Sequence, residues 1–204
     1  MTAGVTNVLL AGVARQPVLA TARLLAEAAL LAGLDVSLSE CPSPAAWSGP
    51  ISVHVRLGDE VHSPLVREGE ADVLVAFEQL EALRAVHLLA PHGFAAVNER
   101  LLPTWRMRAG LEPAPDVTAR LMAVTPRVVG VPAESLVQRL GGAPLIGLVL
   151  LGVVSALLPV PEHAYQAVLT ASGAADLEVR RTALRRGREL FAALPGCVTA
   201  PRAI

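Results

Sequence analysis

The chain contains no lysine, so all 17 of its basic side chains are arginines. We interpret this absence as compositional drift, since no chemistry excludes lysine from every position. The 17 basic residues face 18 acidic ones, which gives a net charge of −1. A net charge this close to zero supplies no electrostatic basis for binding nucleic acid or an anionic membrane surface. We therefore expect neither as a partner.

Charged and aromatic residues are also scarce. Charged residues make up 17% of the sequence, against about 25% in an average soluble domain. Aromatic residues make up 3%, so the hydrophobic 53% is mainly alanine, leucine and valine. So little charge predicts more apolar surface than a lone monomer would expose, and an obligate protein partner would cover it.

The residues of metal and nucleophile chemistry are few. Two cysteines, Cys41 and Cys197, cannot by themselves build an iron–sulfur cluster or a zinc site. We interpret Cys41 as a small buried hydrophobe, because no histidine lies beside it in the sequence. None of the five histidines stands at metal-ligand spacing from another, and no catalytic triad is evident. We predict no catalytic residue and no metal ligand in this chain.

No apolar run is long enough to span a membrane. Residues 141–161 carry no charge, but prolines 144 and 159 bracket them. The helix between them has about 14 residues and a length of ~21 Å, which is shorter than the ~30 Å hydrocarbon core. We predict a buried helix. The N-terminal apolar run lacks the basic flank of a signal peptide, so we expect a cytoplasmic protein.

What the sequence does contain is a β-α-β pattern between residues 7 and 56. An apolar strand at 7–13 leads through Pro17 into about 17 residues of helical spacing, followed by a second strand at 35–40. The helix has one predicted buried stripe, made of Leu24, Leu25, Ala28, Leu31 and Ala32. We predict that the two strands are parallel neighbours. Loops 12–17 and 40–50 then lie at the edge where such sheets meet ligands and partners.

The remaining elements continue this α/β pattern. We predict strands at 51–57, 61–66 (an edge strand, because of Pro64), 72–78, 94–97 and 127–131. We predict helices at 79–89 (with Leu80, Leu83, Val86 and either Leu88 or Leu89 inward), 116–124, 134–140, 145–158, 162–171 and 174–191. Residues 99–115 form a long irregular connection, expected to cover a partner surface. The predicted fold is one domain over 1–204, with a Rossmann-like, helix-flanked, mostly parallel sheet at about 5–133 and a helical part at about 134–192.

Several strings together carry a family resemblance: NVLLAGV, LLAEAALLAGLDV with Glu40 after it, SVHVRLGDEVHSPLV, GEADVLVAFEQLEALR and LVLLGVVSALL. In their order and spacing the chain resembles the gamma subunit, or gamma domain, of the 2-oxoacid:acceptor oxidoreductases. The small subunits of the indolepyruvate:ferredoxin branch are the most similar. The resemblance runs without gaps from Asn7 to about Ala90 and more loosely to Gly187.

The resemblance implies a subunit that is inactive alone. Family members oxidatively decarboxylate a 2-oxoacid to an acyl-CoA. It implies that thiamine diphosphate, iron–sulfur clusters and CoA belong to the complex, with no cofactor bound by this chain. The partner would be a large thiamine-dependent subunit in a hetero-oligomer, for which a dimer of heterodimers is one stoichiometry.

The two loops depart from the family pattern. The family's first loop reads Gly-x-Gly-Gly-Gln-Gly, and only Gly12 and Gln16 of it remain here. The second loop ends Gln-Arg-Gly-Gly, and only Gly49 remains. A glycine-rich turn presents free N–H groups to an anion, whereas a proline such as Pro17 removes a donor. As interface or cofactor-proximal residues we predict Gly12, Arg15, Gln16, Glu40, Trp47, Gly49, His54 and Arg56.

These candidates leave alternatives open. Arg15 either faces solvent or an interface, or replaces a lost positive charge, and Gln16 keeps a turn or interface hydrogen bond. Glu40 could mimic the acidic residue that binds a ribose. Trp47 either anchors an interface or covers its own loop.

Two further sets of polar side chains each have two possible interpretations. His54 and Arg56 belong to a half-solvated strand face or to a partner contact. Five arginines, at 180, 181, 185, 186 and 188, are interpreted as a solvated helix face partly paired with Glu178 and Glu189, with RNA binding as the remote alternative.

The sequence leaves three functions open. The first is a subunit of a 2-oxoacid oxidoreductase. The second is a diverged, non-enzymatic relative that acts in assembly or regulation. The third is a free-standing nucleotide-binding reductase.

Overall fold

The computed structural model describes residues 4–42 and 49–194, and these form one six-stranded sheet flanked by helices. The strand order is β2-β3-β1-β4-β5-β6. The strands are β1 (Thr6–Val13), β2 (Asp35–Pro42), β3 (Pro50–Gly58), β4 (Ala71–Ala76), β5 (Leu89–Asn98) and β6 (Val128–Val131). The pairs β1–β4, β4–β5 and β5–β6 are parallel. The predicted α/β fold with a mostly parallel sheet is therefore confirmed.

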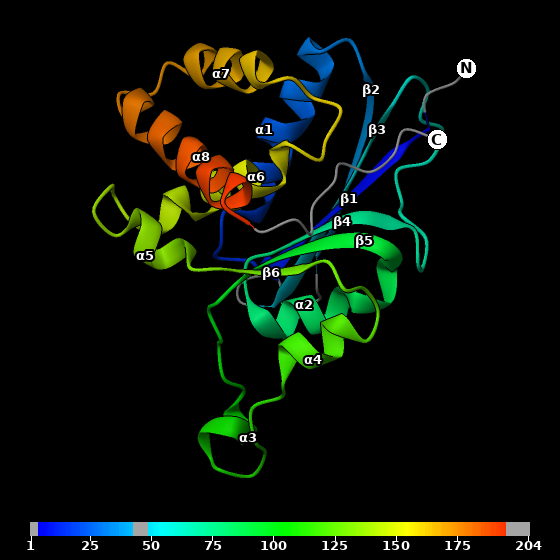
Figure 1. The fold of residues 1–204 in the computed structure, drawn as a ribbon, viewed down its shortest axis with the longest axis vertical. Helices are drawn as coiled ribbons and strands as arrows, with labels where there is room; N and C mark the ends of the chain where they lie inside the picture. The colour runs from blue at the N-terminus through cyan, green and yellow to red at the C-terminus, as the bar shows by residue number, and fades with distance from the viewer. Residues whose placement is uncertain (1–3, 43–48, 195–204) are drawn as a thin grey trace.

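The helices cover both faces of the sheet (Figure 1). They are α1 (Val18–Leu31), α2 (Gln79–Ala85), α3 (Trp105–Arg108), α4 (Val117–Met122), α5 (Ala133–Val137), α6 (Ile146–Ser155), α7 (Glu162–Ala171) and α8 (Leu177–Ala192), with 3₁₀ turns at Val86–Leu88 and Ala143–Leu145. Helices α1, α6, α7 and α8 lie on one side of the sheet, and α2 and α4 lie on the other (Figure 1). The helical C-terminal third is also as predicted.

The prediction that β1 and β2 are neighbours is wrong. Strand β3 lies between them and pairs antiparallel with both. The two strands still run in the same direction, because each is antiparallel to β3. The connection from β1 through α1 to β2 therefore passes over the position of β3. Strand β2 becomes the edge of the sheet, which suits its serines and its exposed Glu40.

The predicted edge strand at 61–66 is also wrong, because these residues form an irregular segment. Side chains of the sheet hold it in place. His54 Nδ1 accepts a hydrogen bond from the Val66 N–H at 3.1 Å, Arg56 donates to Ser63 O at 2.8 Å, and Asp35 accepts from the Val61 N–H at 2.7 Å. Backbone donors here bond to side chains, so they are not available for a strand ladder.

Helix α6 is the centre of the helical layer, and all ten of its residues are buried. The burial predicted for this uncharged run is confirmed. Glycines on two helices, Gly152 of α6 and Gly187 of α8, let the backbones approach closely. None of the described helices combines the length and the apolarity needed to cross a membrane.

The inward faces of α1 and α2 differ in part from the prediction. Leu31 was placed in the buried stripe of α1 but is 61% exposed, whereas Ala29 is fully buried. On α2 the buried apolar residues are Ala82 and Ala85, and the larger Leu80 and Leu83 are half-buried. Leu25 of the predicted α1 stripe is fully buried as expected. On α2, alanines at the contact let the helix lie close to the sheet, and its leucines fall at the margins.

Candidate functional site

The carboxyl ends of β1, β4, β5 and β6 meet at one edge of the sheet, and one backbone carbonyl links the segments that follow them. Phe77 O, just after β4, accepts hydrogen bonds from Gln16 Nε2 and from Asn98 Nδ2, each at 3.0 Å. The same Asn98 amide donates to Glu134 Oε1, after β6, at 3.1 Å. Asn98 is fully buried, so this network fixes the geometry of the edge.

The first loop is a compact turn closed by its own side chain. Gln16 Oε1 accepts from the Val13 N–H at 2.9 Å, and the Gln16 N–H donates to Val13 O at 2.8 Å. The turn hydrogen bond predicted for Gln16 is confirmed. Gly12 is required beneath it, because a Cβ there would lie 2.7 Å from both Gln16 Oε1 and a Val18 methyl.

The two predicted loops do meet at this edge. The Ala14 N–H donates to Gly49 O at 3.0 Å, and Gly49 is buried. This contact follows from β-strand register, because Val13 at the end of β1 lies opposite Pro50 at the start of β3. Trp47 lies outside the described residues.

Beside the first loop lies a crevice of about 720 Å³. Its walls come from the first loop, the start of the 99–115 connection, α5 and the beginning of α6, and they are mainly apolar. Three charged side chains line it: Arg15, Arg100 and Glu134. Arg100 lies 3.8 Å from Glu134, and the exposed Arg15 also borders a second hollow of about 350 Å³ toward α2. The crevice therefore carries one net positive charge.

Sequence reasoning missed Arg100 and Glu134. Both follow a strand end closely, two residues after β5 and three residues after β6. Their position after parallel strands was the available signal, because such positions converge at one edge of the sheet. Their separation of 34 positions in the sequence concealed the ion pair.

The sequence matches the family described as pyruvate ferredoxin/flavodoxin oxidoreductase over residues 7–190. The chain belongs to this family. It is 32% identical over 187 residues to the indolepyruvate oxidoreductase subunit IorB of Archaeoglobus fulgidus, covering 89% of this chain and 92% of that protein. It is 37% identical over 111 residues to IorB of Pyrococcus horikoshii, covering 54% of this chain and 55% of that one.

Solved structures share the fold of this oxidoreductase family member. The keto/oxoacid ferredoxin oxidoreductase gamma subunit of Geobacter sulfurreducens superposes with a TM-score of 0.70 at 19% identity, over 93% of this chain and 99% of that one. The 2-oxoglutarate:ferredoxin oxidoreductase of Magnetococcus marinus, with 2-oxoglutarate, coenzyme A and succinyl-CoA bound, gives 0.71 at 18% identity over 98% of this chain. This chain spans 34% of that longer one.

Three other predicted site residues of this oxidoreductase subunit lie away from the crevice. Glu40 is exposed on the edge strand, opposite Val53 and two strands from β1. His54 and Arg56 project from the α2 side of β3, where the segment 59–70 covers them. His54 is only 6% exposed, so the predicted half-solvated face is wrong for this residue. Arg56 donates to Asn7 Oδ1 as well as to Ser63 O, at 2.8 Å each.

The stability of the protein should depend on the protonation of His54. Burial lowers the pKa of His54 below its ordinary value of 6.5, so below that pH the unfolded chain binds a proton that the folded chain does not. The free energy of unfolding then falls as the pH falls, by at most about 1.4 kcal/mol per pH unit for one proton. Urea unfolding of the wild type and of His54→Asn should show the difference between their free energies of unfolding shrinking from pH 7.5 to pH 5, a range that spans the ordinary histidine pKa of about 6.5.

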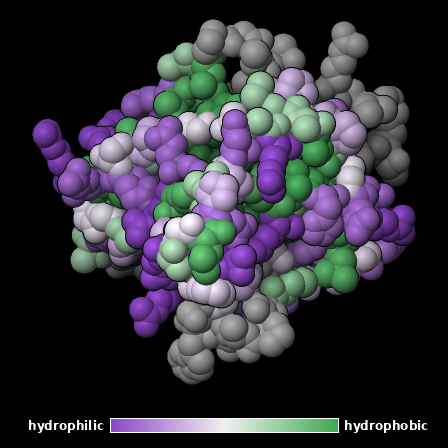
Figure 2. All heavy atoms as spheres, turned by 90° about the horizontal axis from the view of Figure 1, so that it is seen from below, coloured by the Kyte–Doolittle hydropathy of each residue, from purple (hydrophilic) through white to green (hydrophobic). Residues whose placement is uncertain are grey.

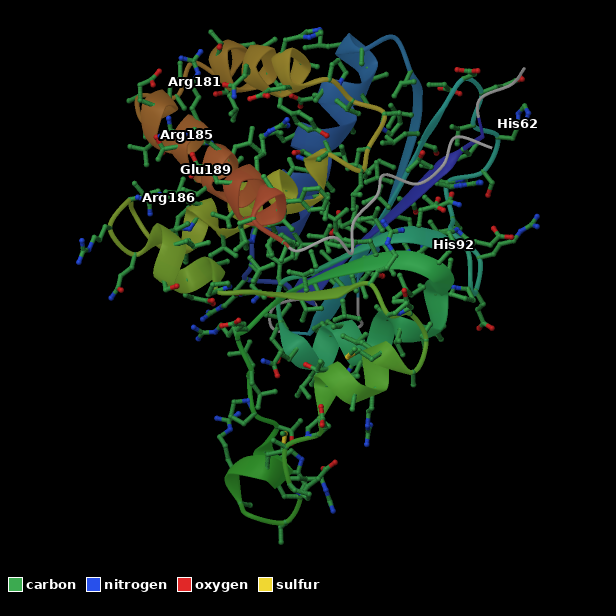
Figure 3. All side chains as sticks on the ribbon, viewed as in Figure 1. His62, His92, Arg181, Arg185, Arg186 and Glu189 are labelled. Atoms are coloured by element: carbon green, nitrogen blue, oxygen red, sulfur yellow. The ribbon has the colours of Figure 1, made fainter. Side chains whose placement is uncertain are left out.

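The matched control for this measurement is His62→Asn. His62 belongs to the same covering segment, but its side chain is 82% exposed and points outward (Figure 3). The change with pH of the difference between the wild type and His54→Asn should be larger than that for His62→Asn. Equal changes for the two variants would contradict the prediction.

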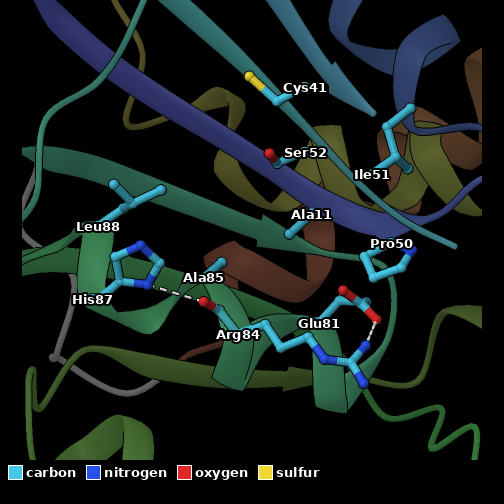
Figure 4. A pocket seen from close by; sticks show the side chains of 10 residues that line it. All are labelled: Ala11, Cys41, Pro50, Ile51, Ser52, Glu81, Arg84, Ala85, His87 and Leu88. Carbon is cyan, nitrogen blue, oxygen red and sulfur yellow. Dashed lines mark hydrogen bonds and ion pairs between the residues drawn. The ribbon is translucent and has the colours of Figure 1, made fainter. Parts of the chain in front are cut away.

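A smaller pocket of about 210 Å³ lies between α2 and strands β1, β2 and β3 (Figure 4). Cys41 and Ser52 line it from the sheet, and Glu81 pairs with Arg84 on the helix side. Burial raises the pKa of Glu81, and the neighbouring Arg84 guanidinium opposes that rise. Cys41 is exposed, so its interpretation as a buried hydrophobe is wrong. No group of three or more His, Cys, Asp or Glu side chains among the described residues could hold a metal ion.

The arginines of α8 have structural partners. Arg181 pairs with Glu178 at 2.6 Å and Arg185 pairs with Glu189 at 3.6 Å, which confirms the predicted pairing for these two arginines (Figure 3). Arg186 instead donates to Leu136 O at 2.7 Å. Arg188 reaches both Ser155 Oγ at 3.0 Å and Glu162 at 3.1 Å. These contacts attach α8 to α5, α6 and α7, so they favour a structural role over RNA binding.

Proposed function

We propose that this chain is the small subunit of a thiamine-dependent 2-oxoacid:acceptor oxidoreductase of the indolepyruvate type. The observation that carries the proposal is the family match over residues 7–190, together with a relative named indolepyruvate oxidoreductase subunit IorB that aligns over 92% of its own length. In this proposal the chain is cytoplasmic and inactive alone, and it assembles with a large subunit into a hetero-oligomer such as a dimer of heterodimers.

The proposed division of labour places the cofactors on the partner. Thiamine diphosphate would supply the carbanion chemistry, iron–sulfur clusters the electron path, and CoA the acyl acceptor. This chain contributes a shaped wall at the carboxyl edge of its sheet, where Arg15, Arg100 and Glu134 surround the crevice. Positively charged side chains at that edge suit an anionic cofactor or a carboxylate of the partner.

The first loop offers fewer free donors to the phosphate of a dinucleotide than a glycine-rich loop would. The amides of Val13, Ala14, Gln16 and Val18 donate within the chain, to Gln16 Oε1, Gly49 O, Val13 O and Gln16 O. Pro17 has no N–H to offer. Four donors of this turn are therefore engaged within the chain, and fewer remain for a phosphate than in a glycine-rich loop.

We accordingly expect no binding of NAD, flavin or CoA by the isolated chain. Isothermal calorimetry should give dissociation constants weaker than about 1 mM, or −4 kcal/mol. A constant of about 10 μM or tighter, near −7 kcal/mol, would instead support a free-standing nucleotide-binding reductase.

The proposed function is tested by purifying the tagged chain from its native host. We expect a large chain to co-purify, to be identified by mass spectrometry, and to carry thiamine diphosphate and an iron–sulfur absorption spectrum. The complex should reduce a viologen dye when supplied with an aryl-pyruvate and CoA. A chain that purifies alone, with no thiamine-containing partner, would overturn the proposal.

The departure of the two loops from the family pattern favours one alternative function. Only Gly12 and Gln16 remain in the first loop and Gly49 in the second, while the scaffold is intact. A diverged relative that acts only in assembly or regulation would have this combination. It predicts the same partner without turnover of any 2-oxoacid, so the dye assay separates the two functions.

A further inference from the structure

The connection between β5 and α4 projects from the body of the protein as an arm. Helix α3, near its end, lies well apart from the sheet and the other helices (Figure 1). The arm, defined as residues 99–115, leaves the same edge that carries the crevice. Its base is held there, because the Leu102 N–H donates to Glu78 at 2.7 Å and Gln79 donates to Glu99 O at 2.8 Å.

The tip of the arm, residues 104–112, is closed by its own hydrogen bonds. Thr104 caps α3 by accepting from the Met107 N–H at 3.2 Å. At the other end Gly110 has a φ of +71°, its N–H donates to Met107 O, and the Leu111 N–H donates to Arg106 O. These two bonds form the Schellman motif that closes a helix. These bonds favour one shape of the turn, so less conformational freedom is lost when it docks than for a loop without them.

The tip displays large apolar side chains to solvent. Trp105 is 66% exposed and Leu111 is 61% exposed. Viewed from the end of the molecule that bears the arm, hydrophobic residues lie among hydrophilic ones (Figure 2). An exposed tryptophan on a preorganised projection is the type of residue that dominates binding energy when a partner pocket buries it.

Charge identifies the kind of surface that receives the tip. The tip carries Arg106, Arg108 and Glu112, and therefore one net positive charge. Arg106 lies 3.5 Å from Glu112, whereas Arg108 forms no ion pair with any described residue. The crevice at the arm's base is lined by two arginines and one glutamate. Because both are positive, the crevice of a second copy is a poor receptor for the tip.

We propose that the arm docks on the large thiamine-dependent subunit, inserting Trp105 and Leu111 into an apolar groove with an acidic rim that pairs with Arg108. This inference rests on the proposed function, because that function supplies the large subunit. The arm begins at the edge where the crevice lies, so both contacts belong to one continuous interface.

The test measures the affinity of this chain for the large subunit purified from the native complex. Three variants are compared with the wild type: Trp105→Ala, Arg108→Glu and the control Leu31→Ala. The control removes a leucine of α1 that is 61% exposed, close to the 66% of Trp105. We expect Trp105→Ala to raise the dissociation constant at least tenfold, equivalent to 1.4 kcal/mol. Arg108→Glu should weaken binding more at low than at high ionic strength. Leu31→Ala should bind as the wild type does.

Thermal unfolding of the isolated variants supplies the second measurement. The melting temperature of Trp105→Ala should lie within about 2 °C of the wild type, because a change at an exposed position typically has little effect on the free energy of unfolding. An unchanged affinity of Trp105→Ala for the large subunit would overturn the inference. So would self-association of the isolated chain that Trp105→Ala abolishes. Failure of the wild-type chain to bind any large subunit would overturn the proposed function first, and the docking inference with it.

Discussion

Replacing Gly187 with alanine is expected to destabilise the protein by about 3 kcal/mol, although alanine is the better helix former by about 1 kcal/mol. The reason is the contact between α6 and α8. A Cβ on Gly187 would overlap the carbonyl oxygen of Val149 and lie 2.8 Å from the Val153 nitrogen and 2.9 Å from the Gly152 Cα. All three are backbone atoms, so no side-chain rotation can relieve the overlap, and the two helices must separate.

The measurement is chemical and thermal unfolding of the isolated chain. For a protein of this size, a loss of about 3 kcal/mol lowers the melting temperature by ~6–12 °C. Arg185→Ala on the exposed side of the same helix is the control, and it should change the free energy of unfolding by less than about 0.5 kcal/mol. A melting temperature for Gly187→Ala at or above that of the wild type would show that helix propensity outweighs the packing conflict.

Replacing Glu78 with alanine is expected to destabilise the protein by a similar amount, about 3 kcal/mol. The Glu78 side chain is 1% exposed and accepts two backbone hydrogen bonds, from Glu81 N at 2.9 Å and from Leu102 N at 2.7 Å. Each bond to a charged acceptor is worth about 1.5–3 kcal/mol. Removing a negative charge beside the buried Glu81 offsets part of this loss, because Glu78 contributes to raising the pKa of Glu81.

The control for Glu78 is Asp116→Ala, which removes the exposed N-cap of α4, where Asp116 accepts from the Ala119 N–H at 2.9 Å. A loss of about 1 kcal/mol is typical of such a cap. Urea unfolding of both variants decides the comparison. The prediction fails if Glu78→Ala costs no more than Asp116→Ala. Because Glu78 also holds Leu102 at the base of the arm, Glu78→Ala should weaken binding to the large subunit as well.

Features of this protein that depend on local pattern could be predicted from the order of its residues. Continuous apolar runs located β1 and β4, and Asp116 marked the start of α4. The uncharged run at 141–161 identified α6 as a buried helix, because the hydrophobic pattern of an element indicates how much of it is buried. The position of the first two loops at one edge of the sheet also followed from the sequence, and the Ala14–Gly49 hydrogen bond bears it out.

Which elements lie next to one another became known only from the folded chain. The placement of β3 between β1 and β2, and of residues 59–70 over His54, depends on backbone pairing between distant segments. The same holds for the meeting of Gln16 and Asn98 at one carbonyl, and of Arg100 with Glu134. Periodicity reports whether a residue is buried. It does not show which strand or helix the residue packs against. Many elements could bury the same apolar area, and the hydrogen-bond register between strands selects one of them.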